Sequence, residues 1–150
     1  MRELDQIMAQ CQEAYEQAES YNEPPAEDGR YTVLIKNIKE VAFSNNSDEF
    51  VALSPVYEVL DGEHAGWVMD GDRGLLGPAS DVKVQMGLRD LKLLAKILNR
   101  GKPFATLSDA CAVIKGSIGA QLIVEVSHGV AKKTGREFSN VRPKELLSVG

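Results

Sequence analysis

Residues 121–142 read Gln-Leu-Ile-Val-Glu-Val-Ser-His-Gly-Val-Ala-Lys-Lys-Thr-Gly-Arg-Glu-Phe-Ser-Asn-Val-Arg. At the start of this stretch Leu122, Val124 and Val126 recur at every second position, which is the period of a strand with one buried face. A second short strand is expected after a turn that contains glycine. The stretch therefore predicts a β-hairpin that closes the fold.

The turn of this predicted hairpin is basic. Gly129 and Gly135 bracket it, and Lys132 and Lys133 lie between them. Pro143 is expected to end the second strand, because proline has no backbone N–H to donate to a neighbouring strand. A hairpin with a flexible tip that carries two lysines has a shape that can close on a phosphate backbone.

The order of the other elements indicates the fold class. They are strands at 31–43, at 50–60 and from 67, a leucine-rich helix at 86–100, and a short helix that starts at a capping box at 106–109. Residues 70–83 contain three glycines and a proline without periodicity, so we predict a long irregular loop there. Three strands, a helix and two more strands match a five-stranded Greek-key barrel of the oligonucleotide/oligosaccharide-binding (OB) type, a mainly β fold of the α+β class.

An amphipathic helix is expected before the barrel, at residues 3–20. Its apolar stripe consists of Leu4, Ile7, Met8, Cys11, Ala14, Tyr15 and Ala18. The stripe can be covered by the chain's own domain, by a second copy of the chain or by another protein. Residues 21–30 contain paired prolines and an Asp-Gly turn, which predicts a linker. We therefore divide the chain into residues 1–28 and a nucleic-acid-binding domain at 29–150.

Composition excludes several classes of protein. The 150 residues are 43% hydrophobic and 26% charged, which is ordinary for a globular domain. No apolar run is long enough for a transmembrane helix, and the first residues lack the features of a signal peptide. Cys11 and Cys111 have no other potential metal ligand at suitable spacing, so we expect two reduced cysteines in a cytoplasmic protein.

The net charge of −5 hides an uneven distribution. Residues 1–30 carry a net charge of −6, residues 31–77 carry −5, and residues 78–150 carry +6 from twelve bases and six acids. Part of the positive charge forms a stripe on the predicted central helix: Arg89, Lys92, Lys96 and Arg100. For this stripe a solvated helix face and a nucleic-acid contact both remain open.

The sequence gives little indication of catalysis. His64 and His128 are expected in exposed turns without an obvious catalytic partner. Four acids, Asp61, Glu63, Asp70 and Asp72, surround the third strand but lack the spacing of a calcium-binding loop. The glycines at 71–77 match neither a phosphate-binding loop nor a dinucleotide motif. We therefore expect no enzyme activity, no metal site and no cofactor.

Binding of single-stranded nucleic acid needs positive charge for the phosphates and aromatic faces for the bases. The candidate aromatic residues are Tyr57, Trp67 and Phe138, for each of which a core position is the alternative. The candidate phosphate contacts are Lys36, Arg73, Lys132, Lys133, Arg136 and Arg142. The loop at 44–49, which would flank the cleft of an OB-type barrel, is neutral to acidic and weakens this interpretation.

Several motifs resemble those of a known family. They are Gly29-Arg-Tyr-x-Val-x-Ile35, Val59-Leu-Asp-Gly-Glu-x-x-Gly66, a leucine-rich helix, and Gly135-Arg-Glu-Phe-Ser-Asn-Val141. Together they resemble a family of small phage proteins long described as a domain of unknown function, over roughly residues 28–142. Trp67 departs from the pattern, since members usually have a basic residue after the glycine that corresponds to Gly66.

The resemblance implies a non-catalytic, OB-like protein that binds single-stranded DNA in phage replication or recombination, in the host cytoplasm. It provides no catalytic residues, and the residues themselves leave RNA open as the ligand. From a different class, the alternative is a protein-interaction module, an inhibitor or adaptor that recognises a replication or host protein through the acidic helix at residues 1–20. A homo-oligomer is compatible with both hypotheses, and neither involves a membrane.

Overall fold

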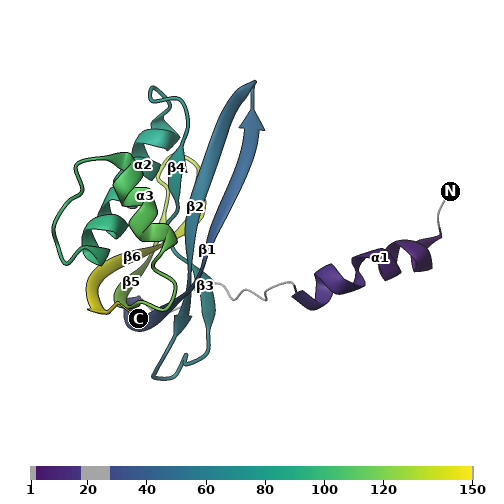
Figure 1. The fold of residues 1–150 in the computed structure, drawn as a ribbon, viewed down its shortest axis with the longest axis horizontal. Helices are drawn as coiled ribbons and strands as arrows, with labels where there is room; N and C mark the ends of the chain where they lie inside the picture. Colours follow the sequence, from purple (N-terminus) through teal and green to yellow (C-terminus); the bar gives the residue numbers. More distant parts are fainter. Residues whose placement is uncertain (1–2, 18–27, 150) are drawn as a thin grey trace.

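The computed structural model describes residues 3–17 and 28–149, which form three helices and a six-stranded antiparallel sheet (Figure 1). Helix α1 (Leu4–Gln17) stands apart from the sheet and confirms the predicted N-terminal helix as far as residue 17. Residues 18–20 of that predicted helix, and most of the predicted linker, lie outside the described residues. Strand β1 begins at Gly29, the first residue of the predicted second domain.

The strands are β1 (Gly29–Asn45), β2 (Asp48–Val59), β3 (Val68–Asp70), β4 (Gly74–Leu76), β5 (Gln121–Val130) and β6 (Glu137–Ser148). Their order along the sheet is β3-β2-β1-β5-β6, and β4 also pairs with β2. Strands β1, β2 and β3 follow one another along the sheet, whereas β5 returns to the side of β1 after two helices. This arrangement is a Greek key. The predicted α+β class, with β structure dominant, is confirmed.

Strand β4 lies within residues 70–83, so the prediction of a long irregular loop is wrong at this strand. Three residues are too few to show a periodic pattern. Asp70 at the end of β3 lies opposite Val56, and Gly74 at the start of β4 lies opposite Leu53. Three residues between β3 and β4 therefore face two residues of β2. This is a β-bulge, which re-aims the side chains that it carries.

Helix α2 (Val82–Leu98) packs closely on β4 because of a glycine. A Cβ atom at Gly87 would lie 2.4 Å from the Leu75 Cβ, so a larger residue would force the helix away from the strand. The helix begins four residues earlier than predicted. Its N-cap is Asp81, whose side chain accepts a hydrogen bond of 2.8 Å from the Lys83 N–H.

Helix α3 (Leu107–Lys115) lies beside α2 and confirms the predicted helix start at Thr106, whose Oγ1 accepts a hydrogen bond of 3.2 Å from the Asp109 N–H. Both helices cover one side of the sheet (Figure 1). The main hydrophobic core joins buried residues of β1, β2 and β5 to residues of α2 and α3. In the described part of the chain no helix is both long and apolar enough to cross a membrane.

Strand β6 continues through Pro143 to Ser148, so the prediction that proline ends it is wrong. Pro143 is tolerated because β6 is the last strand of the sheet, where the missing N–H need not serve a second neighbour. The register with β5 also shifts here, since Val124 pairs with Pro143 but Ile123 pairs with Glu145. This register shift is a β-bulge, and it interrupts the regular backbone pairing of β5 with β6 just after the proline.

The two ends of the sheet meet at Asp72, within the bulge between β3 and β4. The Val141 N–H donates to the Asp72 Oδ1 over 3.0 Å, and the Asp72 N–H donates to the Val141 carbonyl oxygen over 3.2 Å. These bonds attach β6 to the opposite end of the sheet. No strand pairing joins β6 to β3 within residues 28–149, so the sheet is open and the predicted closed barrel stays a prediction.

Candidate nucleic-acid interface

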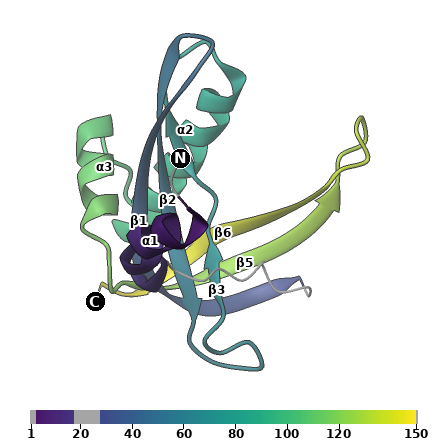
Figure 2. The same ribbon diagram turned by 90° about the vertical axis from the view of Figure 1, so that its right-hand side faces the viewer.

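The predicted closing hairpin exists as β5 and β6, and it projects as an arm (Figure 2). The register explains this shape. Val126 of β5 pairs with Gly29, the first residue of β1. The part of β5 beyond Val126 therefore pairs only with β6, and the core of the protein does not lie under it.

Backbone hydrogen bonds hold the tip of this arm. The Ala131 N–H donates to the Arg136 carbonyl oxygen over 2.9 Å, and the Gly135 N–H donates to the Ala131 carbonyl oxygen over 2.8 Å. Gly135 has a φ of 68°, a left-handed conformation that glycine adopts without steric cost. Lys132, Lys133 and Arg136 are exposed on this turn.

The charges at the tip differ from those at the root of the arm. At the root, Arg142 pairs with Asp72 over 3.7 Å, and Lys144 approaches Glu125 to 4.0 Å. Within residues 28–149 the three cations of the tip, at 132, 133 and 136, make no ion pair. Exposed cations without an internal carboxylate partner are available to an external anion.

Phe138 lies on the same arm, next to these cations. It is directly opposite Gly129, and a Cβ atom there would lie 2.6 Å from the tip of the Phe138 ring. The glycine therefore leaves the space in which the ring rests against β5. The Phe138 side chain is nevertheless 48% exposed, so part of the ring is open for stacking.

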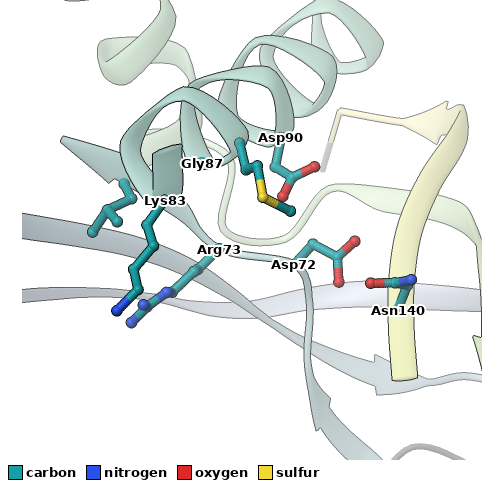
Figure 3. Close-up of a pocket in the computed structure, with 8 residues that line it drawn as sticks. Asp72, Arg73, Lys83, Gly87, Asp90 and Asn140 are labelled. Atoms are coloured by element: carbon teal, nitrogen blue, oxygen red, sulfur yellow. The ribbon is translucent and has the colours of Figure 1, made fainter. Parts of the chain in front are cut away.

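A pocket of about 270 Å³ lies where the arm meets the body of the protein (Figure 3). Its lining comes from the β3–β4 bulge, β4, α2 and β6: Asp72, Arg73, Leu75, Lys83, Met86, Gly87, Asp90 and Asn140. By the alternation of a strand, Phe138, Asn140 and Arg142 share one face of β6. This face leads from the basic tip to the pocket.

The pocket has mixed charge. Arg73 and Lys83 line it together with Asp72 and Asp90. Burial raises the pKa of Asp72, and a hydrogen bond from the β6 backbone and the nearby Arg142 oppose this rise. Burial likewise raises the pKa of Asp90. The acids limit how strongly the pocket itself would attract a polyanion, so the tip is the stronger candidate for an anion contact.

The β1–β2 hairpin brings an aromatic pair to the same region. The rings of Phe43 and Phe50 are stacked with centroids 5.1 Å apart, and the Arg73 guanidinium lies over the Phe43 ring at 5.8 Å. The sequence prediction included Arg73 but missed Phe43. A signal was present, because Phe43 and Phe50 flank a polar turn and pair across the hairpin.

Tyr57 cannot stack a base in this structure, which corrects its assignment to the interface. Its side chain is fully buried in the main core, and its hydroxyl has no hydrogen-bond partner in the described part of the chain. Burial, with a smaller contribution from Asp72, raises the pKa of the hydroxyl. Both faces of β2 are apolar around this position, so the sequence could not show which side the ring takes.

Lys36 and Trp67 lie away from the tip of the arm. Lys36 is an exposed bulge residue of β1, beside the start of β5. Trp67 is half-buried at the edge of the main core, and its carbonyl oxygen accepts a hydrogen bond from Val59. Across the sheet, Val59 lies at the same height as Leu122 of β5. Leu122 is eight residues, or about 26 Å, before the end of β5, so Trp67 lies far from the tip.

His64 lies away from the arm, whereas His128 lies on it, opposite Ser139. His64 is in the β2–β3 loop, where its ring packs edge-on against Trp67 at 5.2 Å. His128 is in β5, so the prediction that it lies in a turn is wrong. Its Nδ1 lies 2.6 Å from the Asp28 Oδ1, a contact that lowers the pKa of Asp28 and ties the start of β1 to the arm.

The acids around β3 are dispersed. Asp70 pairs with Lys39 over 3.3 Å, and Asp72 with Arg142. Across the described ranges, no three His, Cys, Asp or Glu side chains are grouped so that they could hold a metal ion.

The described sheet and helices correspond to a known family. The model of a protein family of unknown function, DUF669, matches residues 13–148. The chain belongs to this family. The DUF669 match includes all six strands, α2 and α3, whereas residues 4–12 of α1 precede it. Comparison with curated proteins gives no match.

Proposed function

We propose that this protein binds single-stranded DNA without catalysing a reaction. The observation that carries the proposal is the β5–β6 arm, which combines a partly exposed aromatic ring with three cations that make no ion pair within residues 28–149. A flexible polyanion with stackable bases fits both features, since phosphates meet the cations and a base stacks on Phe138. The resemblance to phage proteins supports a role in phage replication or recombination, in the cytoplasm of the host.

We further propose that the sheet is an OB-type barrel with incomplete closure. The Greek-key order supports this proposal, and so do the two hydrogen bonds between Asp72 and Val141 that attach β6 to the β3–β4 bulge. In OB folds the loops between the first and second strands and between the last two strands flank the binding cleft. Here these loops are the β1–β2 turn and the basic tip of the arm, with the pocket at 72–90 between them.

The expected binding is only weakly dependent on base sequence. The cations contact the phosphate backbone, and every base has a face that can stack. A direct test is a fluorescence-anisotropy titration of labelled oligodeoxythymidylate with the full chain at low salt. Saturable binding at micromolar protein or below supports the proposal, and its absence contradicts it. A parallel titration with oligouridylate of the same length distinguishes a DNA preference from general single-strand binding.

A further inference from the structure

We propose that α1 of one copy of this chain docks in the groove between α2 and α3 of a second copy. The first observation is that the apolar side of α1 is exposed over residues 4–11. Leu4, Ile7 and Met8 are 69%, 45% and 52% exposed, and Cys11, one turn further along, is exposed too. An isolated helix of 14 residues is marginally stable in water. We therefore expect the apolar face of α1 to be stabilised by packing against another surface.

The second observation is an apolar groove of about 220 Å³ on the helical layer. Its apolar lining comes from α2, α3 and the loop between them: Leu88, Leu91, Ala95, Phe104, Leu107 and Ala110. Leu107 at its rim is 48% exposed. The groove is therefore suited to side chains such as leucine, isoleucine and methionine from an amphipathic helix.

Charge makes α1 the matching occupant. The α1 sequence contains Asp5, Glu13 and Glu16 and no lysine or arginine. Lys92 lines the groove, and Lys96 lies one turn further along α2 with its side chain exposed. An apolar groove bordered by lysines attracts an apolar helix that carries acids.

The position of α1 indicates which copy it occupies. Figures 1 and 2 show α1 on the opposite side of the β1–β2 hairpin from α2 and α3. To reach its own groove, α1 would have to move from this side of the sheet to the other. A second copy can present its groove to α1 without that movement, and reciprocal docking about a two-fold axis would form the contact twice. The occupant is therefore the α1 helix of a second copy.

The two native cysteines provide the test. Cys11 is on the exposed side of α1, and Cys111 is half-buried on α3, next to Ala110 of the groove. The variants Cys11→Ser and Cys111→Ser are mixed, so that each chain has one remaining cysteine, and treated with a short bis-maleimide. We expect a covalent dimer that contains a Cys11–Cys111 cross-link, identified by mass spectrometry of the linked peptides.

Two other patterns would overturn the proposal. If the wild-type chain forms the Cys11–Cys111 cross-link but the mixture does not, α1 occupies the groove of its own chain. If Cys111→Ser alone forms a Cys11–Cys11 dimer and the mixture gives no Cys11–Cys111 link, α1 pairs with a second α1 instead.

Sedimentation velocity gives an independent measurement. Ile7→Asp places a charge on the exposed apolar side of α1, and we expect the dissociation constant of self-association to rise at least about tenfold. Gln6→Asp introduces the same charge next to Ile7, off the stripe, and is expected to leave self-association within about threefold of the wild type. A wild-type chain that stays monomeric at high micromolar concentration contradicts the docking of α1 on a second copy.

Discussion

The two long hairpins of this protein have similar lengths but different support. The β1–β2 hairpin rests on a second core cluster formed by Phe50, Ala52, Leu75 and Val84. The tip of the β5–β6 arm, residues 132–139, is exposed throughout. Packing explains Phe50 and Ala52 of the first hairpin, although its turn at residues 44–49 is exposed as well. Packing does not explain the three cations and the partly exposed ring at the end of the β5–β6 arm. The arm is therefore the stronger candidate for a binding surface.

Their turns differ in the same way. Asn46 and Ser47 have φ angles of 51° and 69°, which is the geometry of a tight two-residue turn, and acidic residues follow it. The turn of the arm is longer and basic. If the two loops flank one cleft, the arm provides attraction for a polyanion and the β1–β2 turn opposes it. Variants that alter one hairpin at a time separate the two contributions.

Reversing the charge at the tip of the arm is expected to have the largest effect. Lys132→Glu with Lys133→Glu removes two phosphate contacts, and we expect affinity for oligodeoxythymidylate to fall by about 10- to 100-fold at 50 mM salt. Because both side chains are exposed, the melting temperature should stay within about 2 °C of the wild type. Anisotropy titrations and thermal melts measure the two quantities.

A control variant changes the total charge by the same amount elsewhere. Arg100→Glu with Lys102→Glu alters two exposed cations in the turn after α2. We expect its affinity to fall by less than about threefold, as a surface charge outside the contact has only a screened effect. Equal losses in both double variants would mean that total charge, rather than the arm, determines binding.

Removing the ring of Phe138 is expected to have the next largest effect. Phe138→Leu keeps an apolar side chain against Gly129 but has no aromatic face, and one stacked base is worth about 1–3 kcal/mol. Because leucine keeps an apolar contact, we expect the loss to lie at the lower end of this range, with affinity falling about fivefold to tenfold in the same titration.

Tyr57→Phe is the matched control for an aromatic residue in the core. It removes a buried hydroxyl that has no partner. The free energy of unfolding, from urea denaturation, should rise by about 1 kcal/mol, and affinity for DNA should not change. A loss of affinity in Tyr57→Phe would restore this residue to the interface.

At the β1–β2 turn, replacing acidic residues with lysine is expected to raise the affinity for DNA. Asp48→Lys with Glu49→Lys replaces two exposed acids on the less favourable side of the cleft. If this loop flanks the DNA, we expect affinity to rise by about threefold at 50 mM salt, which is less than one full phosphate contact provides. Unchanged affinity would remove the β1–β2 turn from the interface and leave the arm alone.

The smallest predicted effect concerns stability and pH. Burial raises the pKa of Asp72 above its ordinary value of 3.8, so the folded state binds this proton more tightly than the unfolded state. The stability that follows is complete below pH 3.8 and is lost as the pH rises through the raised pKa. Asp72→Asn retains an acceptor for the Val141 N–H without the charge, so its stability should fall less over this range.

Urea denaturation from pH 4 to pH 7 measures this difference between the wild type and Asp72→Asn. Asp72→Ala, which also removes the acceptor, should lose about 1 kcal/mol relative to Asp72→Asn at any pH in the range. Identical pH profiles for the wild type and Asp72→Asn would contradict the assignment of the raised pKa.

The sequence predicted those elements in which local pattern and tertiary packing agree. Alternation located β1 and β5, and the predicted N-terminal cap at Thr106 located the start of α3. Prediction from the sequence failed where contacts between distant parts of the chain determine the local structure. Strand β4 is formed by pairing with β2 and by the space at Gly87, neither of which leaves a periodic trace. Pro143 is accepted because β6 is the last strand, a position that only the topology reveals.

The candidate interface was predicted in part. Lys132, Lys133, Arg136 and Phe138 share one arm because they are close in sequence. The pocket could not be predicted, because it joins Asp72, α2 and Asn140 across distant parts of the chain. Burial of Tyr57 depends on which face of β2 meets the core, and an apolar pattern on both faces does not specify it.

The salt dependence of DNA affinity is the most direct measure of phosphate contact by the β5–β6 arm. Its slope depends on the number of phosphate contacts rather than on the total charge of the protein. For the wild type and for Lys132→Glu with Lys133→Glu, the logarithm of the association constant is measured against the logarithm of salt concentration. Each phosphate contact on a single strand contributes about 0.7 to the slope, so the wild-type line should be steeper by about 1.4. Parallel lines for the two proteins would contradict the claim that the β5–β6 arm holds the phosphate backbone.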